Sequence, residues 1–321
     1  MAKYLMISGA GEGLSTALKL RFEGHDVAVW IRDGRSKDRY DGMIKKVDRW
    51  EKFLDKDTIV LFDSRGGGKT ADRLRAQGHR VIGGSTVMDQ VEGDPELGRE
   101  ILAQAGAHPS KVVESGYFTG DRFAGSESLF STSRDRAMPG DLGPVVGLQG
   151  QLVWAREARE LPKLTEFLKQ HQYEGPVAIQ GDGFAPRWSA FPAAFELGAK
   201  VPFDGPLRDG FASAVRVSSP SGVEGSLLGV ERSHRDRLYL QDVHLAENGD
   251  VRIGKSGSVA LVSGFGETAG EAFKHSYDLA QLIQVPDKMY RNDLASLEQD
   301  WSVWINPAQE APNERQVVSA G

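Results

Sequence analysis

A glycine-rich turn, Gly9-Ala10-Gly11-Glu12-Gly13, lies between a short apolar run and a stretch with helical periodicity. The run from Tyr4 to Ser8 is typical of a buried strand, and Leu14, Ala17 and Leu18 are spaced as on one face of a helix. A strand connected to a helix by a glycine-rich turn is typical of open α/β sheets. Ligands of such sheets lie at the carboxyl ends of the strands.

The same alternation continues through the first hundred residues. We expect strands at 27–31, 58–62 and 80–82, and helices at 70–77 and 95–105, with Gly78 ending the first of these helices. Strands that alternate with helices in this way predict a doubly wound parallel sheet of the α/β class.

The pattern changes after residue 109. The sequence predicts a β-hairpin around Thr119-Gly120-Asp121 and a glycine- and proline-rich loop over 134–150. It then predicts an amphipathic helix at 157–171, a strand at 177–180, short strands over 214–262 and a helix at 271–283.

Composition excludes several classes of protein. The chain has 321 residues, a formal charge of -6 and no cysteine. A negative net charge argues against general nucleic-acid binding, because phosphate-rich partners need a basic surface. The absence of cysteine removes disulfide scaffolds and thiolate sites. No stretch is long and apolar enough for a signal peptide or a membrane span, so we expect no membrane partner and a cytoplasmic location.

Two glycine runs allow alternative interpretations. Backbone N–H groups of Gly9 to Gly13 could bind a phosphate, or the run could be a tight turn that binds nothing; its order is G-x-G-x-G, not the dinucleotide G-x-G-x-x-G. The run Gly66-Gly67-Gly68-Lys69-Thr70 lacks the first glycine of a P-loop, because position 63 is Asp63. We interpret it as a loop at the ligand edge of the sheet.

Other catalytic patterns are missing. The seven histidines show no zinc-ligand spacing, so no metal site is predicted. The G-x-S-x-G elbow that carries a serine nucleophile is also missing. Arg134, Asp135, Arg136 and Asp141 surround the glycine- and proline-rich segment, which is either a connector or a loop that clasps a ligand.

Five segments, taken in order, resemble phosphoribosylamine–glycine ligase, the glycinamide ribonucleotide synthetase branch of the ATP-grasp superfamily. They are the turn at 9–13, Val91-Glu92-Gly93-Asp94 before a helix, Gly140-Asp141-Leu142-Gly143-Pro144, the segment 258–268, and Tyr290-Arg291-Asn292-Asp293. The resemblance implies a pre-ATP-grasp open-sheet domain followed by a reduced ATP-grasp-like α+β region.

The resemblance also implies a chemistry and a set of site residues. In this family ATP phosphorylates a carboxylate, and a sugar-phosphate amine attacks the acyl phosphate. The carried-over substrate-binding residues are Gly9, Gly11, Glu12, Gly13, Asp141, Gly143, Pro144, Arg291 and Asp293.

The sequence departs from the family where ATP and metal would bind. The segment that supplies the ATP-gripping lobe is missing, because Ala107-His108-Pro109-Ser110 runs almost directly into Lys111. The family's metal-binding pair aligns with Arg187 and Ser189, and a guanidinium cannot coordinate magnesium. Val145-Val146 also replaces the Asn-Thr pair of the D-x-G-P loop.

Three functional hypotheses follow. In the first, a shortened family member keeps the substrate half, binds a phosphorylated sugar or nucleotide-like molecule, and has lost or altered ATP-dependent ligation. In the second, it is an active ligase of purine or modified-nucleotide synthesis, uses ATP and magnesium, and replaces the lost cations with Arg65, Lys69 and Arg187. In the third, it is an interaction or assembly protein with a protein partner or a second copy of itself.

The domain boundaries expected from these patterns are 1–107 for the open-sheet domain, 108–203 for the reduced ATP-grasp-like core, 204–300 for a β-rich domain ending in a helix, and 301–321 for a tail.

Overall fold

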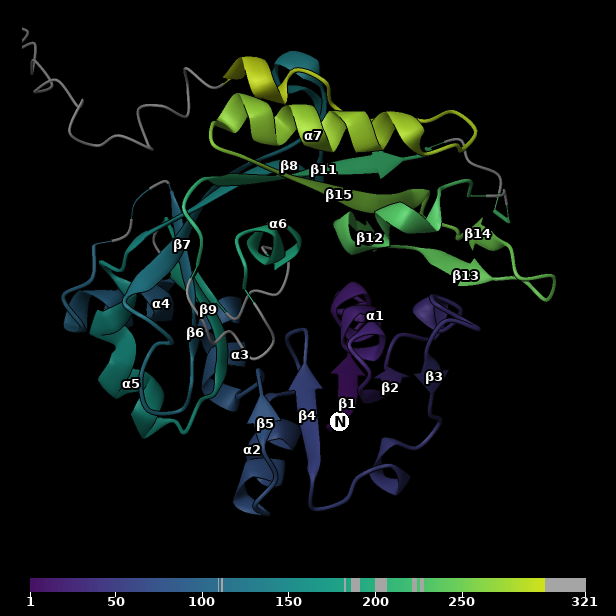
Figure 1. Ribbon diagram of the computed structural model, residues 1–321. Coiled ribbons are helices and arrows are strands. Elements are labelled where there is room, and N and C mark those ends of the chain that lie inside the picture. Colours follow the sequence, from purple (N-terminus) through teal and green to yellow (C-terminus); the bar gives the residue numbers. More distant parts are fainter. Residues whose placement is uncertain are drawn as a thin grey trace, which may run out of the picture.

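The computed structural model describes residues 1–108, 110, 112–181, 183–185, 191–199, 207–220, 224–225 and 228–297. Figure 1 shows two sheets, one parallel and N-terminal, the other largely antiparallel, with helix α1 between them. An α/β domain with an open parallel sheet is thus followed by an α+β region, in the order that the sequence predicts.

The parallel sheet has the order β3-β2-β1-β4-β5. Its strands are β1 (Lys3–Ser8), β2 (Asp26–Ile31), β3 (Lys45–Lys46), β4 (Thr58–Phe62) and β5 (Val81–Ile82). Its helices are α1 (Leu14–Phe22), α2 (Gly68–Ala76), α3 (Thr86–Gly93) and α4 (Pro95–Gln104). The strands predicted in this half are all present, because strand alternation and glycine stops are local signals.

Helices cover both faces of this sheet, as a doubly wound sheet requires. Tyr4 and Met6 of β1 pack in one hydrophobic cluster with α1, while Leu5 and Ile7 pack in another with α2. Successive side chains of a strand point to opposite faces, so this single strand contributes to both layers.

The second sheet has eight strands in the order β10-β9-β6-β7-β8-β11-β15-β12. Their bounds are β6 (Val113–Phe118), β7 (Glu127–Met138), β8 (Leu142–Glu157), β9 (Gly175–Gln180), β10 (Gly183–Ala185), β11 (Phe211–Ser218), β12 (Leu238–Leu240) and β15 (Ser258–Gly266). A separate pair is formed by β13 (Val243–Leu245) and β14 (Val251–Ile253).

Two predictions in this half are wrong in part. The loop expected over 134–150 is the end of a long β7–β8 hairpin, in which Arg136 pairs with Val145 and Met138 with Leu142. Gly140 and Gly143 have positive φ near the tip of the hairpin, and the pairing shifts register between Arg134 and Arg136 and again between Arg136 and Met138.

The helix expected over 157–171 begins later. Strand β8 continues to Glu157, a 3-10 turn follows at Leu161–Leu164, and α5 covers only Thr165–Gln170. The remaining helices are α6 (Phe191–Glu196) and α7 (Ala269–Leu282).

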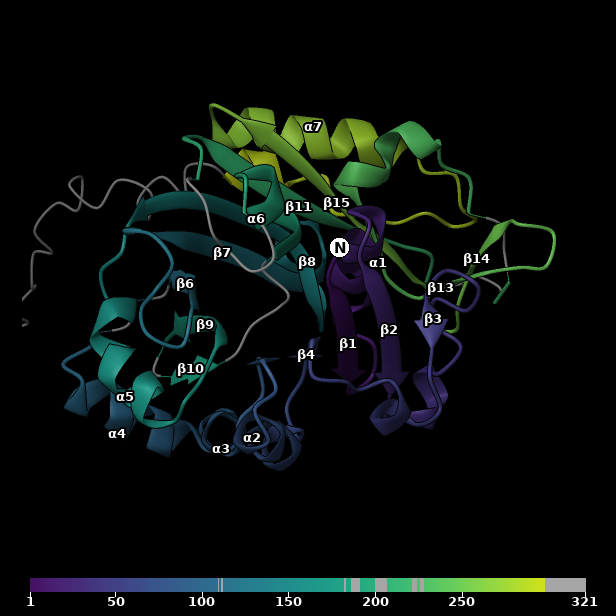
Figure 2. The same cartoon turned by 60° about the horizontal axis from the view of Figure 1, so that its bottom comes forward.

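The two sheets share one hydrophobic core. Helix α7 covers the outer face of β11 and β15, and the opposite side of that sheet faces α1 (Figures 1 and 2). One buried cluster contains Leu14 of α1, Trp154 of β8 and Val262 of β15. The N–H of Tyr40 donates to the carbonyl of Val243 at 2.5 Å, which adds a direct link between the two halves.

The predicted domain division stays a prediction. Strands β8 and β11, which come before and after the expected boundary at residue 204, pair with each other in one sheet. Within the described part of the chain, no helix is both long and apolar enough to cross a bilayer.

The second glycine run begins α2 where the chain packs closely on its neighbours. A Cβ atom at Gly68 would lie 2.3 Å from the backbone carbonyl carbon of Ser85, and one at Gly67 would lie 2.6 Å from the ring of Phe62. Close packing therefore accounts for both glycines without a ligand.

We predict that Gly68→Ala destabilises the fold by about 3 kcal/mol, because backbone cannot move aside as a flexible side chain can. The urea midpoint measures this change. Gly34→Ala is the matched control, since nothing lies within 4 Å of a Cβ there and its φ is ordinary. Equal midpoints for the two variants would contradict the packing argument.

Candidate functional site

The turn after β1 is closed by a buried aspartate. The carboxylate of Asp63, at the end of β4, accepts hydrogen bonds from the N–H of Gly13 at 2.7 Å and the N–H of Gly9 at 3.2 Å. The hydroxyl of Ser8 donates to the same carboxylate at 2.6 Å and accepts from the N–H of Gly11 at 2.7 Å. The start of α1 therefore faces a carboxylate supplied by the chain itself.

Burial raises the pKa of Asp63, and the nearby Glu12 raises it further, against the hydrogen bonds from Ser8 and Gly13. The N–H groups that a phosphate would need already have acceptors, including Ala10, whose N–H donates to Glu12 at 3.0 Å. A phosphate at this turn would have to displace these groups. Binding there stays a prediction.

The backbone N–H groups of the second glycine run also have a carboxylate of the protein as their acceptor. The N–H groups of Gly66 and Gly68 each donate to the carboxylate of Asp89 at 2.8 Å. Arg65 is exposed, with its guanidinium 3.5 Å from the carbonyl of Glu92, and Lys69 is exposed. The carboxylate of Asp89 therefore supplies the anion that these backbone N–H groups bind.

Three of the predicted residues meet in an ion-pair network. The guanidinium of the fully buried Arg291 donates to Asp293 at 2.6 and 2.9 Å and to Asp141 at 2.6 Å. Asp293 also accepts from the N–H of Gly140 at 2.9 Å. This network, which we call the Arg291 clamp, ties the tip of the β7–β8 hairpin to the segment after α7.

The clamp shifts the pKa values of its members. Hydrogen bonding to Asp293 raises the pKa of Arg291. Burial alone would raise the pKa of Asp293, but the hydrogen bonds from Arg291 and Gly140 outweigh it and hold that pKa below 3.8. Asp141 has a φ of 55°, a conformation that is costly for an aspartate unless its partners hold it.

A cavity of about 460 Å³ lies between the glycine turn and the antiparallel sheet. The parallel domain contributes Gly11, Glu12 and Arg39 to its walls. The antiparallel half contributes residues from β8, α6, β11, β15 and the segments next to β12 and β14: Val146, Leu148, Pro192, Arg216, Gln241, Asp242, Ser256, Ser258 and Leu261. We call it the interdomain pocket.

Arg39 joins the two sides of the interdomain pocket. Its guanidinium donates to the carbonyl of Ala10 at 2.7 Å and lies 3.5 Å from the carboxylate of Asp242. Asp242 is buried and also accepts from the N–H of Ser256 at 2.7 Å. The charges of Arg39 and Asp242 therefore compensate each other.

Arg216 differs from Arg39. Burial lowers the pKa of its guanidinium, its Nε is withdrawn from solvent, and it has no hydrogen-bond or ion-pair partner among the described residues. The hydroxyl of Ser258, in the same pocket, likewise has no partner within the described part of the chain. A charge that is withdrawn from solvent and has no counter-charge is costly in free energy. Such groups are frequent at functional sites, so we take the interdomain pocket as the candidate site.

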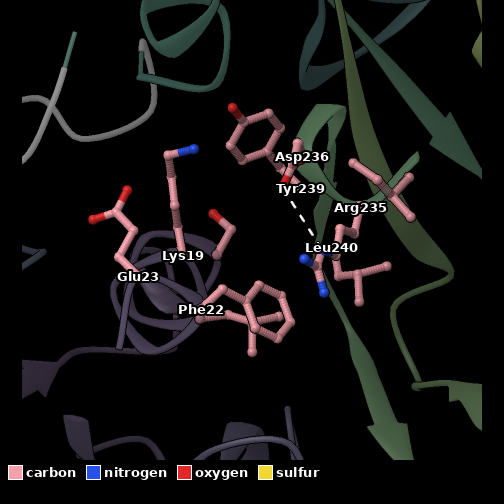
Figure 3. A pocket seen from close by; sticks show the side chains of 10 residues that line it. Lys19, Phe22, Glu23, Arg235, Asp236, Tyr239 and Leu240 are labelled. Carbon is pink, nitrogen blue, oxygen red and sulfur yellow. Dashed lines mark ion pairs between the residues drawn. The ribbon is translucent and has the colours of Figure 1, made fainter. Parts of the chain in front are cut away.

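A smaller cavity of about 110 Å³ lies between α1 and β12. Figure 3 shows Lys19, Phe22 and Glu23 on one side of it, and Arg235 and Asp236 on the other. Arg235 lies 3.8 Å from its neighbour Asp236 and 5.6 Å from the ring centre of Phe22. Its small volume and paired charges make it a weaker candidate than the interdomain pocket.

The described residues contain no group of three or more His, Asp or Glu side chains placed to hold a metal ion. Arg187 and Ser189, which align with the family's metal-binding pair, lie outside the described residues. The described residues therefore do not form a magnesium site.

The structure divides the predicted site residues into groups. Of the glycine turn, Gly11 and Glu12 line the interdomain pocket; Asp141, Arg291 and Asp293 form the clamp. The remaining predicted residues are outside the set that lines the pocket: Gly9, Gly13, Gly143, Pro144, Arg65 and Lys69.

Sequence reasoning missed Arg39, Arg216 and Asp242. One signal was present: Arg216 is the only charged residue in the strand Phe211–Ser218. An arginine in an otherwise small and apolar strand is rarely buried without a partner.

We predict that Arg291→Met destabilises the protein by about 3 kcal/mol, because it removes the buried cation shared by Asp293 and Asp141, and Arg134 remains as an ion-pair partner for Asp141 alone. The matched control is Arg136→Met on the same hairpin, where an exposed arginine donates to the carbonyl of Gly143. Urea unfolding measures both. A loss no larger than that of the control would contradict the clamp.

The clamp also predicts a pH dependence. The pKa of Asp293 is lowered on folding, so its contribution is fully present above its unfolded pKa of about 4 and is lost as the pH falls through the folded value. We expect Asp293→Asn to lose less stability than the wild type between pH 5 and pH 2. Parallel curves of unfolding free energy against pH would refute this assignment.

Comparison with known proteins supports the fold. No protein-family model and no curated protein matches the sequence. Among solved structures, the phosphoribosylamine–glycine ligase of Thermotoga maritima aligns at 14% identity and a TM-score of 0.59, covering 91% of this chain and 100% of that one.

Two other solved structures are similar to a comparable degree. The urea amidolyase of K. lactis aligns at 12% identity and a TM-score of 0.60, over 95% of this chain but only 22% of that protein. The biotin carboxylase subunit of pyruvate carboxylase aligns at 9% identity and a TM-score of 0.57, over 96% of this chain and 99% of that one. The chain therefore has the ATP-grasp-like fold of phosphoribosylamine–glycine ligase, and the predicted fold class is confirmed.

Proposed function

We propose that this chain binds a phosphorylated sugar or nucleotide-like molecule in the interdomain pocket, and that it is a phosphoribosylamine–glycine ligase-like protein whose ATP-dependent ligation is lost or altered. One observation carries the proposal: the predicted turn residues Gly11 and Glu12 meet the antiparallel sheet around a cavity whose Arg216 has no partner among the described residues.

The position of the pocket supports this proposal. Ligands of open parallel sheets bind beyond the carboxyl ends of the strands, and Gly11 and Glu12 follow the carboxyl end of β1. A volume of about 460 Å³ falls within the range of small-molecule sites. Hydroxyls, carboxylates and arginines line it, which suits a ligand with both hydroxyl and anionic groups.

The short connection before the antiparallel sheet supports the loss or alteration of ligation. Helix α4 ends at Gln104 and β6 begins at Val113, so the intervening chain is too short to form a lobe. The resemblance places the family's ATP-gripping segment here. Phosphoryl transfer depends on groups that hold and neutralise the triphosphate, and this connection has no room for them.

An active ATP-dependent ligase of purine or modified-nucleotide synthesis is the second candidate, and the fold shared with phosphoribosylamine–glycine ligase favours it. In that case ATP and magnesium would be required, with Arg65, Lys69 and Arg187 as candidate phosphate-binding residues. A non-enzymatic assembly role, with a protein partner or a second copy of the chain, is the third candidate. A cytoplasmic location stays a prediction.

Ligand-dependent unfolding separates the three candidates. We expect ribose 5-phosphate, AMP or ADP to raise the melting temperature, with no magnesium-dependent release of ADP from ATP in the presence of glycine and phosphoribosylamine. ADP release at enzymatic rates would establish the ligase. No stabilisation by any of these compounds, together with a stable oligomer or a co-purifying protein, would favour the assembly role.

The place of binding is tested at the pocket wall. We predict that Val146→Trp weakens the stabilisation by ribose 5-phosphate at least tenfold in apparent affinity, because an indole at this half-exposed wall position fills the pocket. Val145→Trp is the matched control: it is the adjacent residue on β8 and is outside the set of residues that line the pocket. Equal affinities for the two variants would place the ligand elsewhere.

A further inference from the structure

Arg216 points into the interdomain pocket because of its place in β11. Ser213 in the same strand donates to the carbonyl of Ala272 in α7 at 2.8 Å, so Ser213, Val215 and Val217 face that helix. Arg216 lies on the opposite face, toward the parallel domain, where it lines the pocket.

A comparison with Arg75 shows how unusual this arginine is. Burial lowers the pKa of both guanidinium groups. Arg75 has acceptors for its charge: its guanidinium lies 3.1 Å from Asp72 and donates to the carbonyl of Gly83 at 2.8 Å. Arg216 has no such acceptor among the residues that the structure describes.

The other charges of the pocket leave Arg216 available to a ligand. Asp242 is compensated by Arg39, and Glu12 accepts from the N–H of Ala10. Neither carboxylate lies within ion-pair distance of Arg216. An arginine stays protonated at neutral pH, and its planar fork matches the oxygens of a phosphate or a carboxylate.

We propose that Arg216 is the anion anchor of the interdomain pocket: its guanidinium binds the phosphate or carboxylate group of the ligand. The proposal rests on the proposed function and assigns to that site a specificity-determining residue outside all the motifs that resemble the ligase family. The neighbouring Ser258 hydroxyl is the second group that lacks a partner within the described chain, and it contributes a hydrogen bond to the same anion.

This assignment predicts opposite effects on the empty and the liganded protein. Arg216→Gln removes an uncompensated charge, so the ligand-free variant has a melting temperature equal to or above that of the wild type. The same variant binds ribose 5-phosphate about thirtyfold more weakly, since a desolvated charged hydrogen bond is lost. A purely structural arginine would lower the melting temperature instead.

The experiment compares three probes by thermal shift and titration calorimetry: ribose, ribose 5-phosphate and ribonate. A phosphate site is indicated by stabilisation with ribose 5-phosphate alone, and a carboxylate site by stabilisation with ribonate alone. In either case the difference from ribose is expected to vanish in Arg216→Gln. The matched control, Arg252→Gln, removes an arginine of β14 that is paired with Asp250 and lies outside the pocket, and it should bind as the wild type does.

The outcomes separate the anchor from the proposed function. If Arg216→Gln binds ribose 5-phosphate within threefold of the wild type, the anchor assignment is wrong and the proposed function stands. If the wild type binds none of the probes, the proposed function fails, and the anchor with it. If Arg216→Gln does not fold, Arg216→Lys replaces it: a tenfold loss of affinity supports the bidentate anchor, and unchanged affinity overturns it.

Discussion

The carboxylate of Asp63 organises the functional edge of the parallel sheet. It joins the end of β4 to the end of β1 and to the first turn of α1, through the N–H groups of Gly9 and Gly13 and the hydroxyl of Ser8. The N–H of Gly13, at the start of α1, would otherwise be among the unsatisfied groups of a helix start. This arrangement buries the carboxyl group of Asp63, and its pKa is raised because desolvation outweighs the hydrogen bonds.

The second glycine run repeats this arrangement with a different acid. Asp89, in α3, accepts from Gly66 and Gly68 at the start of α2. Both turns thus have the backbone geometry of anion sites, but a side chain of the protein supplies the anion. Glycine-rich sequence is needed here for close packing and turn conformation, and it does not by itself indicate a phosphate.

Two arginines elsewhere in the molecule differ in whether a carboxylate compensates their charge. Arg291 is fully buried and satisfied by Asp141 and Asp293, so it fastens the long hairpin to the segment after α7. Arg216 is desolvated without a partner among the described residues and lines a cavity. A satisfied buried charge stabilises one geometry, whereas an unsatisfied one stores free energy that a ligand can recover.

Local sequence determined the parallel half and the general class of the fold. The strand at Thr58–Phe62 and the helix from Pro95 follow from short apolar runs, a capping Asp94 and glycine stops, all of which act within a few residues. The order of five motif segments was enough to predict the ATP-grasp-like architecture. The β7–β8 hairpin was misread because glycine and proline are loop signals locally, while the pairing of Arg136 with Val145 depends on a partner strand.

The site depended on tertiary structure. The sequence by itself indicated Gly11, Glu12, Asp141, Arg291 and Asp293, but only folding separates the first two, at a pocket, from the last three, in a clamp. It is also folding that gives Arg216 its significance, because a charge becomes costly only when packing removes water and supplies no counter-charge. Sequence specifies which groups are present; the distances between them, and hence their free energies, are decided by contacts between residues far apart in the chain.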